Sequence, residues 1–503
     1  MISTRARQSS FPSRLGIALV LALSADFLLF DQTPGISVFI FAALLAAAII
    51  LVHRFPGGQK ALLAKCVALL IGLVPLIENV SELSISIALL SLAAFALAMA
   101  GRLRARLLPI VEQIFGFLLV TPIHLGWDLR RWRLAARRVG GGTVKLVSLI
   151  VWLMPLILSA VFIALFGVAN PVIEHWLSLI DFWALLNRIE IARILFWIVV
   201  IVVTWAFLRP RLRRRARRST WLPVSRQTTT IEDIVFGKAA ILRALILFNA
   251  IFAIQTLLDG AYLWGGVALP AGVTYASYAH SGAYPLIATA LLAALFVLIA
   301  MRPGSATSAD GRIRMLVYAW IAQNVVLVIS SILRLDLYVS IYSLTYWRVS
   351  AFIWMALVAT GLMLIMARIA FEKSSEWLCS ANFLTLFATL YLCCFVNFGA
   401  LIASYNIQHS RELGGEGQQL DIYYLRSLGR EAVPSIDRVF AEGRLTTGNS
   451  SPILRQQLYE LVMRYDESNA NWRGWTFRNW RLSRYLERNP FAPATQDAAS
   501  NER

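Results

Sequence analysis

Eleven apolar segments constrain the fold of this chain of 503 residues more than any other feature. A helix of about 20 residues, rising about 1.5 Å per residue, crosses the roughly 30 Å hydrocarbon core of a bilayer. The segments are 15–30, 36–52, 61–77, 83–100, 144–168, 191–208, 239–258, 283–301, 313–333, 349–369 and 378–403. With 58% hydrophobic and 15% charged residues, the chain is far more apolar than a soluble protein. The sequence therefore predicts an all-α, polytopic transmembrane helix bundle over residues 1–404.

Lys and Arg are distributed unevenly between the two ends of these segments. Basic residues next to a span are retained on the cytoplasmic side of a bacterial inner membrane. With the N-terminus inside, the predicted cytoplasmic ends hold 30 of the basic residues that precede residue 406, and the opposite ends hold 4. These four are Arg188, Arg193, Arg334 and Arg348. The pattern predicts a multi-pass inner-membrane protein with a cytoplasmic N-terminus, an uncleaved first span and an extracytoplasmic C-terminus.

The formal net charge of +19 raises the question of nucleic-acid binding, above all for the Arg-rich run 209–218. This run directly follows a span on the predicted cytoplasmic side, where positive clusters orient the protein and attract anionic lipid. We therefore expect membrane lipids as partners, with anionic lipid at the cytoplasmic Arg clusters, and no nucleic acid. A docking site for an unidentified cytoplasmic protein is the alternative.

Two amphipathic stretches are not counted as spans. The first, 107–135, contains an apolar part at 107–120 that Arg-rich sequence flanks on both sides, and it carries Glu112 and Gln113. It suits a helix in the cytoplasmic interface or a re-entrant segment. The second, 171–190, places Trp and Leu at helical spacing beside acidic residues. Both also fit plain amphipathic connectors.

A polar tail follows the last span. Gly and Pro separate its expected helices, which are 420–428, a segment entered near Pro434, 452–465 and 471–487. The last one would align Trp472, Trp475, Leu482 and Leu486 on one face, which packs against the tail, rests on the outer leaflet or caps the outward pocket. The tail therefore predicts an extracytoplasmic α-helical module over 405–488, followed by a disordered C-terminus at 489–503.

Catalytic signatures are missing from the sequence. It contains no phosphate-binding loop, no zinc-protease motif and no nucleophile elbow in a strand-to-helix context. The five histidines lie far apart along the chain. The sequence therefore predicts no cofactor and no metal site, and it predicts no catalytic residue.

Polar residues gather toward the predicted outer halves of spans seven to ten. Ionisable groups are rare inside membranes and are functional candidates where they occur. The candidate cluster comprises Gln255, Asp259, Tyr262, Tyr278, His280, Gln323, Asn324, Arg334 and Arg348. These residues either line a pocket that opens outward or form an aromatic belt with ordinary hydrogen bonds between helices.

Several motifs in the second half resemble one known family. They are LFNAIFAIQTLLD at 247–259, YLWGG at 262–266, YASYAHSGAY at 275–284, AQNV at 322–325, SSILR at 330–334, YSLTYWR at 342–348 and LDIYYLRSLG at 420–429. The chain is similar here to the uncharacterised bacterial membrane family called domain of unknown function 4173. The resemblance implies a multi-span bacterial membrane protein and brings no activity, ligand or catalytic residue with it.

Three classes of function remain open. The missing catalytic motifs, the exported tail and the Arg clusters favour a non-enzymatic sensor, regulatory or assembly component. A permease for a small solute is the first alternative, based on Gln323, Asn324 and the outer polar cluster. An enzyme that acts on a lipid-linked substrate at the outer face is the second, with Asp259 or His280 as the acid or base.

Overall fold

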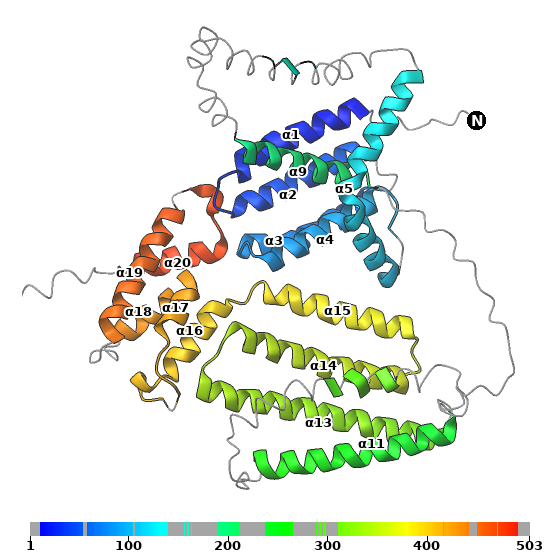
Figure 1. Ribbon diagram of the computed structural model, residues 1–503, viewed down its shortest axis with the longest axis vertical. Helices are drawn as coiled ribbons and strands as arrows, with labels where there is room; N and C mark the ends of the chain where they lie inside the picture. Colours follow the sequence, from blue (N-terminus) through cyan, green and yellow to red (C-terminus); the bar gives the residue numbers. More distant parts are fainter. Residues whose placement is uncertain are drawn as a thin grey trace, which may run out of the picture. The chain divides into compact units, whose positions relative to one another are not determined.

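The computed structural model describes the chain mainly as helices (Figure 1). It covers residues 11–53, 58–103, 106–138, 190–210, 237–264, 310–415, 417–441, 450–469 and 471–490, with short pieces at 155, 158–159, 162, 288–289, 291–293 and 295–297. All regular elements in these ranges are helical. Eight of the described helices are long and apolar enough to cross a membrane. The protein is therefore an all-α, multi-span membrane protein, as the apolar segments predict.

The membrane-length helices coincide with the predicted apolar segments. They are α1 (Phe11–Leu29), α3 (Gln59–Glu78), α4 (Glu82–Met99), α9 (Ile191–Leu208), α11 (Lys238–Asp259), α13 (Gly311–Tyr342), α14 (Tyr346–Ala370) and α15 (Ser375–Cys393), and α11 continues in a π-helical turn. Segment 36–52 forms the shorter apolar helix α2 (Ile36–Val52) of 17 residues. The predicted spans 144–168 and 283–301 lie mostly outside the described residues.

The last predicted span, 378–403, is interrupted. Helix α15 ends at Cys393, and a separate helix, α16 (Phe398–Gln408), follows. The Asn397 side chain accepts a hydrogen bond from the backbone N–H of Ala400 at 3.0 Å and so begins the new helix. The predicted continuous helix is wrong here, because a run of apolar residues does not reveal a break that capping and tertiary contacts create.

The amphipathic stretch at 107–135 lies within one continuous helix, α5 (Leu107–Arg138), of 32 residues. Ile114 and Phe117 are buried against the end of α9, where the rings of Phe117 and Phe207 meet edge to face with centroids 5.4 Å apart. The chain does not reverse direction within this helix. The structure therefore gives one continuous helix at this position.

Two compact units divide the chain. The first comprises Met1–Arg215 and Asn471–Thr476, and the second Ala216–Ala470 and Phe477–Arg503. In the first unit α1, α2, α3, α4, α5 and α9 share one hydrophobic core that encloses the Trp205 side chain completely. Helices α3 and α4 pack tightly, since a Cβ at Gly72 would lie 2.1 Å from the Ser91 hydroxyl oxygen. Small residues allow this close approach between membrane helices.

The segment Asn471–Thr476 packs on the turn between α1 and α2 within the first unit. The backbone N–H of Ile36 donates to the Trp475 carbonyl at 2.7 Å, and the Asn471 amide donates to the Gln32 side chain at 2.5 Å. The Arg473 guanidinium lies over the Phe27 ring, 4.3 Å from its centroid. The chain approaches so closely that a Cβ at Gly35 would overlap the backbone of Gly474.

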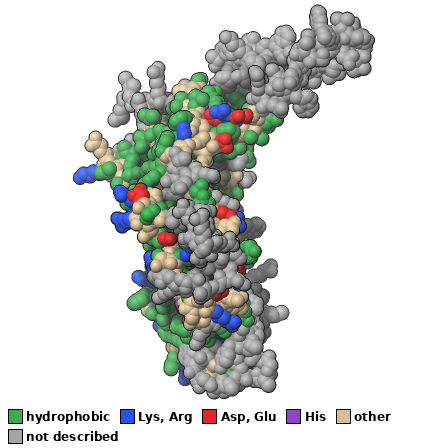
Figure 2. All heavy atoms as spheres, turned by 90° about the vertical axis from the view of Figure 1, so that its left-hand side faces the viewer, with side chains coloured by type: hydrophobic (Ala, Val, Ile, Leu, Met, Phe, Trp, Pro, Cys, Tyr) green, Lys and Arg blue, Asp and Glu red, His purple; other side chains and the backbone are tan. Residues whose placement is uncertain are grey.

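The tail helices of the second unit are α17 (Ile422–Ser427), α18 (Val433–Ala441), α19 (Ser450–Asn469) and α20 (Phe477–Arg488). Their core includes Leu425, Ile436, Leu458 and Leu482, and it continues into α16 and the end of α13. Gly429, with φ at +71°, ends the α17 region in the left-handed conformation that glycine favours. Figure 2 views the molecule from the side on which the tail lies in Figure 1, where charged side chains alternate with hydrophobic ones.

The last tail helix is shorter than predicted. Residues Trp472–Gly474 form a single 3-10 turn, and α20 begins only at Phe477. Trp472 and Trp475 therefore do not share a helix face with Leu482 and Leu486, which pack into the tail core. The helical periodicity predicts α20 correctly but places its start too early. Residues Asn471–Thr476 pack on the turn between α1 and α2 instead of forming the first turns of the helix.

Candidate functional site

The centre of the candidate site is a buried ion pair between α11 and α13. Asp259, the last residue of α11, is 2% exposed, and Arg334 on α13 is 3% exposed. The Arg334 guanidinium donates to one carboxylate oxygen of Asp259. Two opposite charges enclosed in this way are held by each other, because neither has bulk water to solvate it.

Two neighbouring side chains complete the shell around Asp259. Gln255, one helical turn earlier on α11, donates to Oδ1 of Asp259 at 2.9 Å. Ser330, one turn before Arg334 on α13, donates its hydroxyl to Oδ2 at 2.6 Å. Both carboxylate oxygens therefore accept hydrogen bonds from side chains of the protein itself.

The ion pair forms because α11 and α13 run parallel. At their other ends the Lys238 ammonium pairs with Asp310, whose side chain also caps α13 through the backbone N–H of Arg312 at 2.8 Å. The hydrogen bond from Lys238 is the main reason that the pKa of the Asp310 carboxyl lies below its usual value. Midway, Phe248 stacks on Trp320 with ring centroids 5.1 Å apart.

Parallel spans require the chain between them to return across the membrane. The predicted span 283–301 would supply this return, and its described residues 288–289, 291–293 and 295–297 are all helical. Phe296 from this segment packs edge to face on both Phe248 and Trp320. The parallel pairing of α11 and α13 therefore agrees with an eighth span at this position.

A π-helical turn, Gly260–Trp264, directly follows Asp259 and contains Tyr262. Such turns are rare and are frequently found at functional sites. Tyr262 is half-buried on this turn. Tyr278 and His280, the next two predicted members of the cluster, lie outside the described residues.

Gln323 and Asn324 belong to α13 but not to the ion-pair shell. Asn324 is ten residues before Arg334, which is about 15 Å along a helix. Its amide donates to the Trp320 carbonyl at 2.8 Å. In the described part of the chain, Oδ1 of Asn324 and Oε1 of Gln323 are buried and accept no hydrogen bond. These two oxygens form a second polar position in the middle of the span.

Arg348 lies apart from Asp259, in the first turn of α14. Its guanidinium donates to the carbonyls of Tyr342, at 2.5 Å, and Ser343, and it covers the Tyr338 ring at 4.6 Å from the centroid. A cation at the end of a helix satisfies its last carbonyls. The structure therefore gives Arg348 a capping position rather than a place in the buried cluster.

The sequence prediction missed two functional candidates. Ser330 lies four residues before Arg334, the spacing of one helix face, but a serine in a span is too common to signal a site. Asn406 of α16 binds the α13–α14 turn, with its Oδ1 accepting from the Leu344 N–H at 2.6 Å and its Nδ2 donating to the Leu344 carbonyl at 2.9 Å. No local pattern predicts a contact across 62 residues.

The cluster fits neither a metal site nor an open acid. Among the described residues, no group of three or more His, Cys, Asp or Glu side chains is placed to hold a metal ion. Asp259 has both oxygens occupied and almost no exposed surface. Chemically, the buried ion pair can hold α11 and α13 together. Separation of the two helices would break the pair.

The fold and this site define a multi-span helical membrane protein with a polar pair buried between two parallel helices. A family model, Domain of unknown function (DUF4153), matches residues 65–439, and the chain belongs to this family. The resemblance drawn from the sequence motifs names a different number, 4173, and is corrected here. Aromatic residues at the ends of apolar spans recur in many membrane proteins, so those motifs do not separate such families. No curated protein matches the chain, and no solved structure does.

Proposed function

We propose that this protein is a non-enzymatic component of a bacterial inner membrane, acting as a sensor or assembly factor through its tail. The observation that carries the proposal is the continuous core shared by the tail helices and the membrane helices of the second unit. Val339 and Leu344 of the α13–α14 region lie in one cluster with Ile402, Leu425 and other tail residues. Binding of a partner to the tail therefore acts directly on the ends of spans.

Polar contacts make this coupling specific. The Asn406 side chain forms hydrogen bonds with both the N–H and the carbonyl of Leu344. The Tyr424 hydroxyl oxygen accepts a hydrogen bond from the Tyr346 N–H at 3.1 Å. Arg478 of α20 pairs with Glu431 at 2.9 Å and also donates to the Val396 carbonyl at 3.2 Å, beyond the end of α15. Apart from the Arg478–Glu431 pair, which lies within the tail, each contact joins a side chain to backbone where a membrane helix begins or ends.

The tail also contributes to both compact units. Residues 471–476 belong to the first unit, while α19 and α20 on either side belong to the second. A partner that shifts the tail would therefore alter the packing of residues in each unit. This is the behaviour expected of a sensory or assembly module.

The proposed orientation has a cytoplasmic N-terminus and an extracytoplasmic tail. Within the first unit, Arg193 pairs with Asp26 at the end of α1 that leads to the docked tail segment. At the opposite end, Arg209 pairs with Asp128 at 3.0 Å, near the start of α1, where Phe11 contacts Trp205. Burial and the positive charges of Arg14 and Arg102 lower the pKa of His53 there. A basic end opposite the tail supports the positive-inside assignment.

The burial of Asp259 argues against the enzyme alternative in the form that uses this residue. A general acid or base must reach the proton that it transfers. Asp259 is 2% exposed, and Arg334, Ser330 and Gln255 surround its carboxylate. A structural ion pair explains these contacts without a reaction.

The test is crosslinking in cells from exposed tail positions. A photoreactive amino acid replaces Tyr423, which is 80% exposed, or Tyr459, which is 41% exposed on the adjacent helix α19. The control replaces Leu257, a 73% exposed apolar residue of α11. We expect the same protein partner at both tail positions and none at Leu257. Crosslinks only to lipid at all three positions would contradict the proposal.

A small-solute permease is the second candidate, and the polar groups inside the second unit favour it. Buried ionisable pairs in spans often mark solute or proton pathways. Gln323 and Asn324 add buried oxygens without partners in the described part of α13. Uptake and efflux profiles of a deletion strain, complemented by the wild type or by a Gln323→Leu variant, test this function. Identical profiles in all strains would exclude it for the solutes measured.

A further inference from the structure

Arg368, near the end of α14, is a buried cation without a counter-ion among the described residues. Its side chain is 3% exposed, and Nη2 donates to the Ser375 hydroxyl at 3.2 Å. Nη1 is buried and has no hydrogen-bond partner, and no ion pair in the described part of the chain includes Arg368. Enclosing a charge without compensation is costly. The geometry therefore calls for an anion at this position.

The guanidinium lies at the beginning of another helix. Ser375 is the first residue of α15, and Ser374 caps this helix by accepting from the Trp377 N–H at 3.1 Å. The exposed Lys373 precedes the cap, and its N–H donates to the Arg368 carbonyl at 2.9 Å. The N-terminus of α15, a helix of 19 residues, lies beside an arginine and a lysine. Together these three features favour the binding of a phosphate. The exposed Glu372 and Glu376 flank this position and do not pair with Arg368.

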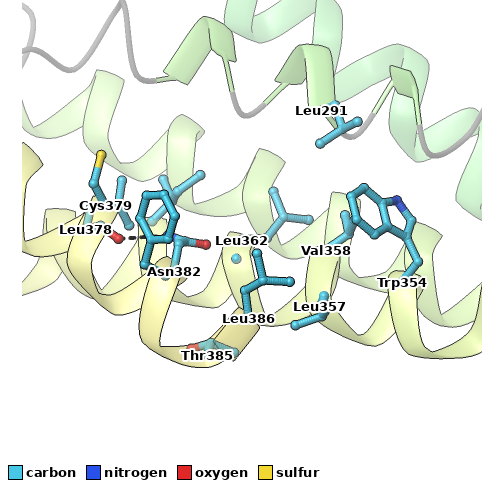
Figure 3. Close-up of a pocket in the computed structure, with 13 residues that line it drawn as sticks. Leu291, Trp354, Leu357, Val358, Leu362, Leu378, Cys379, Asn382, Thr385 and Leu386 are labelled. Atoms are coloured by element: carbon cyan, nitrogen blue, oxygen red, sulfur yellow. Dashed lines mark hydrogen bonds between the residues drawn. The ribbon is translucent and has the colours of Figure 1, made fainter. Parts of the chain in front are cut away.

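An apolar groove begins one helical turn away. It is a cavity of about 440 Å³ between α14 and α15, closed on one side by Leu291 (Figure 3). Leu378 lies at one end of the view and Trp354 at the other, with Leu362 and Leu386 between them. The Asn382 amide in its wall donates to the Leu378 carbonyl at 2.9 Å. The lining is therefore almost entirely hydrocarbon.

The groove and the cation share the same helix faces. Ile365, which lines the groove, is three residues before Arg368, and Leu378 is three residues after Ser375. Residues at this spacing lie above one another on a helix. From Trp354 to Ile365 the groove follows α14 for 11 residues. This is about 16 Å, close to half of the roughly 30 Å hydrocarbon core, the depth of one leaflet.

We propose that this position binds one anionic phospholipid. Its phosphate is held by Arg368 and the N-terminus of α15, and one acyl chain occupies the groove between α14 and α15. The phosphate neutralises the buried guanidinium, while the chain fills apolar space that no described side chain occupies. This site is distinct from the Arg clusters proposed to attract lipid at the membrane surface, and it does not depend on the proposed function.

The experiment uses the full-length protein in detergent micelles with a phosphatidylglycerol that carries a photoreactive acyl chain. After irradiation, mass spectrometry of peptides locates the label. We expect it on residues 354–365 and 378–386. The variant Arg368→Gln should lower this labelling about tenfold, since charge-assisted hydrogen bonds to the phosphate are lost. The control Arg312→Gln, which removes an exposed arginine at the start of α13, should leave it unchanged.

Two further measurements separate the possible sources of the signal. A diacylglycerol probe with the same photoreactive chain, which carries no phosphate, should label the groove no better than phosphatidylglycerol labels Arg368→Gln, and inorganic phosphate should not displace the anionic lipid. Equal labelling by both lipids, equal labelling of Arg368→Gln, or full displacement by phosphate would overturn the proposal.

A third variant covers the case in which Arg368→Gln fails to fold. Thr385→Trp fills the groove with Arg368 intact, and it should abolish labelling of residues 354–365. Undiminished labelling of a monodisperse Thr385→Trp protein would equally overturn the proposal.

Discussion

The buried ion pair of Asp259 and Arg334 should contribute strongly to the free energy of unfolding. Replacing Asp259 by Asn leaves the Arg334 guanidinium enclosed without its counter-ion, and removal of one partner from such a pair costs about 3–5 kcal/mol. We expect this loss in the free energy of unfolding, measured by denaturant titration in detergent. The double variant Asp259→Leu with Arg334→Met should recover most of it, because it removes both charges together.

A matched control comes from the ion pair of the first unit. Asp26 pairs with Arg193, whose side chain is 48% exposed, and half-exposed pairs contribute about 1 kcal/mol or less. Asp26→Asn should therefore cost far less than Asp259→Asn. Equal losses for the two variants would mean that burial does not govern the Asp259 pair.

Tyr485 gives the tail a measurable dependence on pH. Burial, followed by its hydrogen bond to Asp437 at 2.8 Å, raises the pKa of Tyr485 to about 12. Since the folded-state pKa is raised above the usual value of about 10, the stabilisation is complete below pH 10. It is lost as the pH rises from 10 through 12.

The variant Tyr485→Phe tests this dependence. It should lower tail stability by about 1 kcal/mol below pH 10, and the difference from the wild type should pass through zero and reverse sign between pH 10 and 12. Limited proteolysis of the tail across this range measures both values. A difference that stays constant from pH 9 to 12 would show that ionisation of the Tyr485 hydroxyl does not affect tail stability.

At the scale of elements, the turn between α13 and α14 depends on a helix from the tail. Ser343 in this turn has φ at +68° and ψ at 165°, a conformation that only glycine adopts readily. The Asn406 side chain holds the next residue, Leu344, by both its N–H and its carbonyl. A strained turn persists where surrounding contacts over-determine it, and α16 supplies them here.

Asn406→Leu should therefore loosen the tail from the membrane helices. We expect a loss of about 2–3 kcal/mol, because two buried hydrogen bonds disappear and the Leu344 backbone groups stay buried. Hydrogen exchange at residues 343–346 and protease cleavage between α16 and α17 should both rise. Gln408→Leu, at an exposed position of the same helix, is the control. Unchanged exchange in the Asn406 variant would remove the coupling on which the proposed function depends.

For the molecule as a whole, the asymmetry of Lys and Arg predicts the orientation in the membrane. A C-terminal alkaline phosphatase fusion should be active, and a C-terminal fluorescent protein that folds only in the cytoplasm should be dark. An N-terminal fluorescent fusion should be bright. The reverse pattern at the C-terminus would require an even number of spans.

Much of the helical architecture could be predicted from the sequence because each span must satisfy its own backbone inside lipid. Segments 36–52 and 191–208 coincide with α2 and α9 for this reason. The break at 394–397 and the late start of α20 could not be predicted. Both depend on contacts with distant residues, namely Arg478 on the carbonyl of Val396 and Trp475 on the backbone of Ile36.

For the candidate site, the sequence identified Gln255, Asp259 and Arg334 by their polarity in apolar surroundings, and the structure brings these three together. The sequence could not show that Arg348 and Asn324 lie outside the shell around Asp259. Arg348 caps α13, and Asn324 lies elsewhere along that helix. Nor could the sequence reveal that Ser330 completes the shell. Polarity is a property of single residues, whereas pairing depends on the relative rotation of two helices.

The sequence by itself determined that this chain is a bundle of membrane helices, because apolar segments of about 20 residues cross hydrocarbon as helices that satisfy all their own backbone hydrogen bonds. Only the tertiary structure decided which helices are neighbours, that α11 and α13 run parallel, and that the tail holds the α13–α14 turn. Packing between apolar helices depends on shape and on a few buried polar groups. Those groups meet only after residues as distant as 259 and 334, or 344 and 406, come together in the fold.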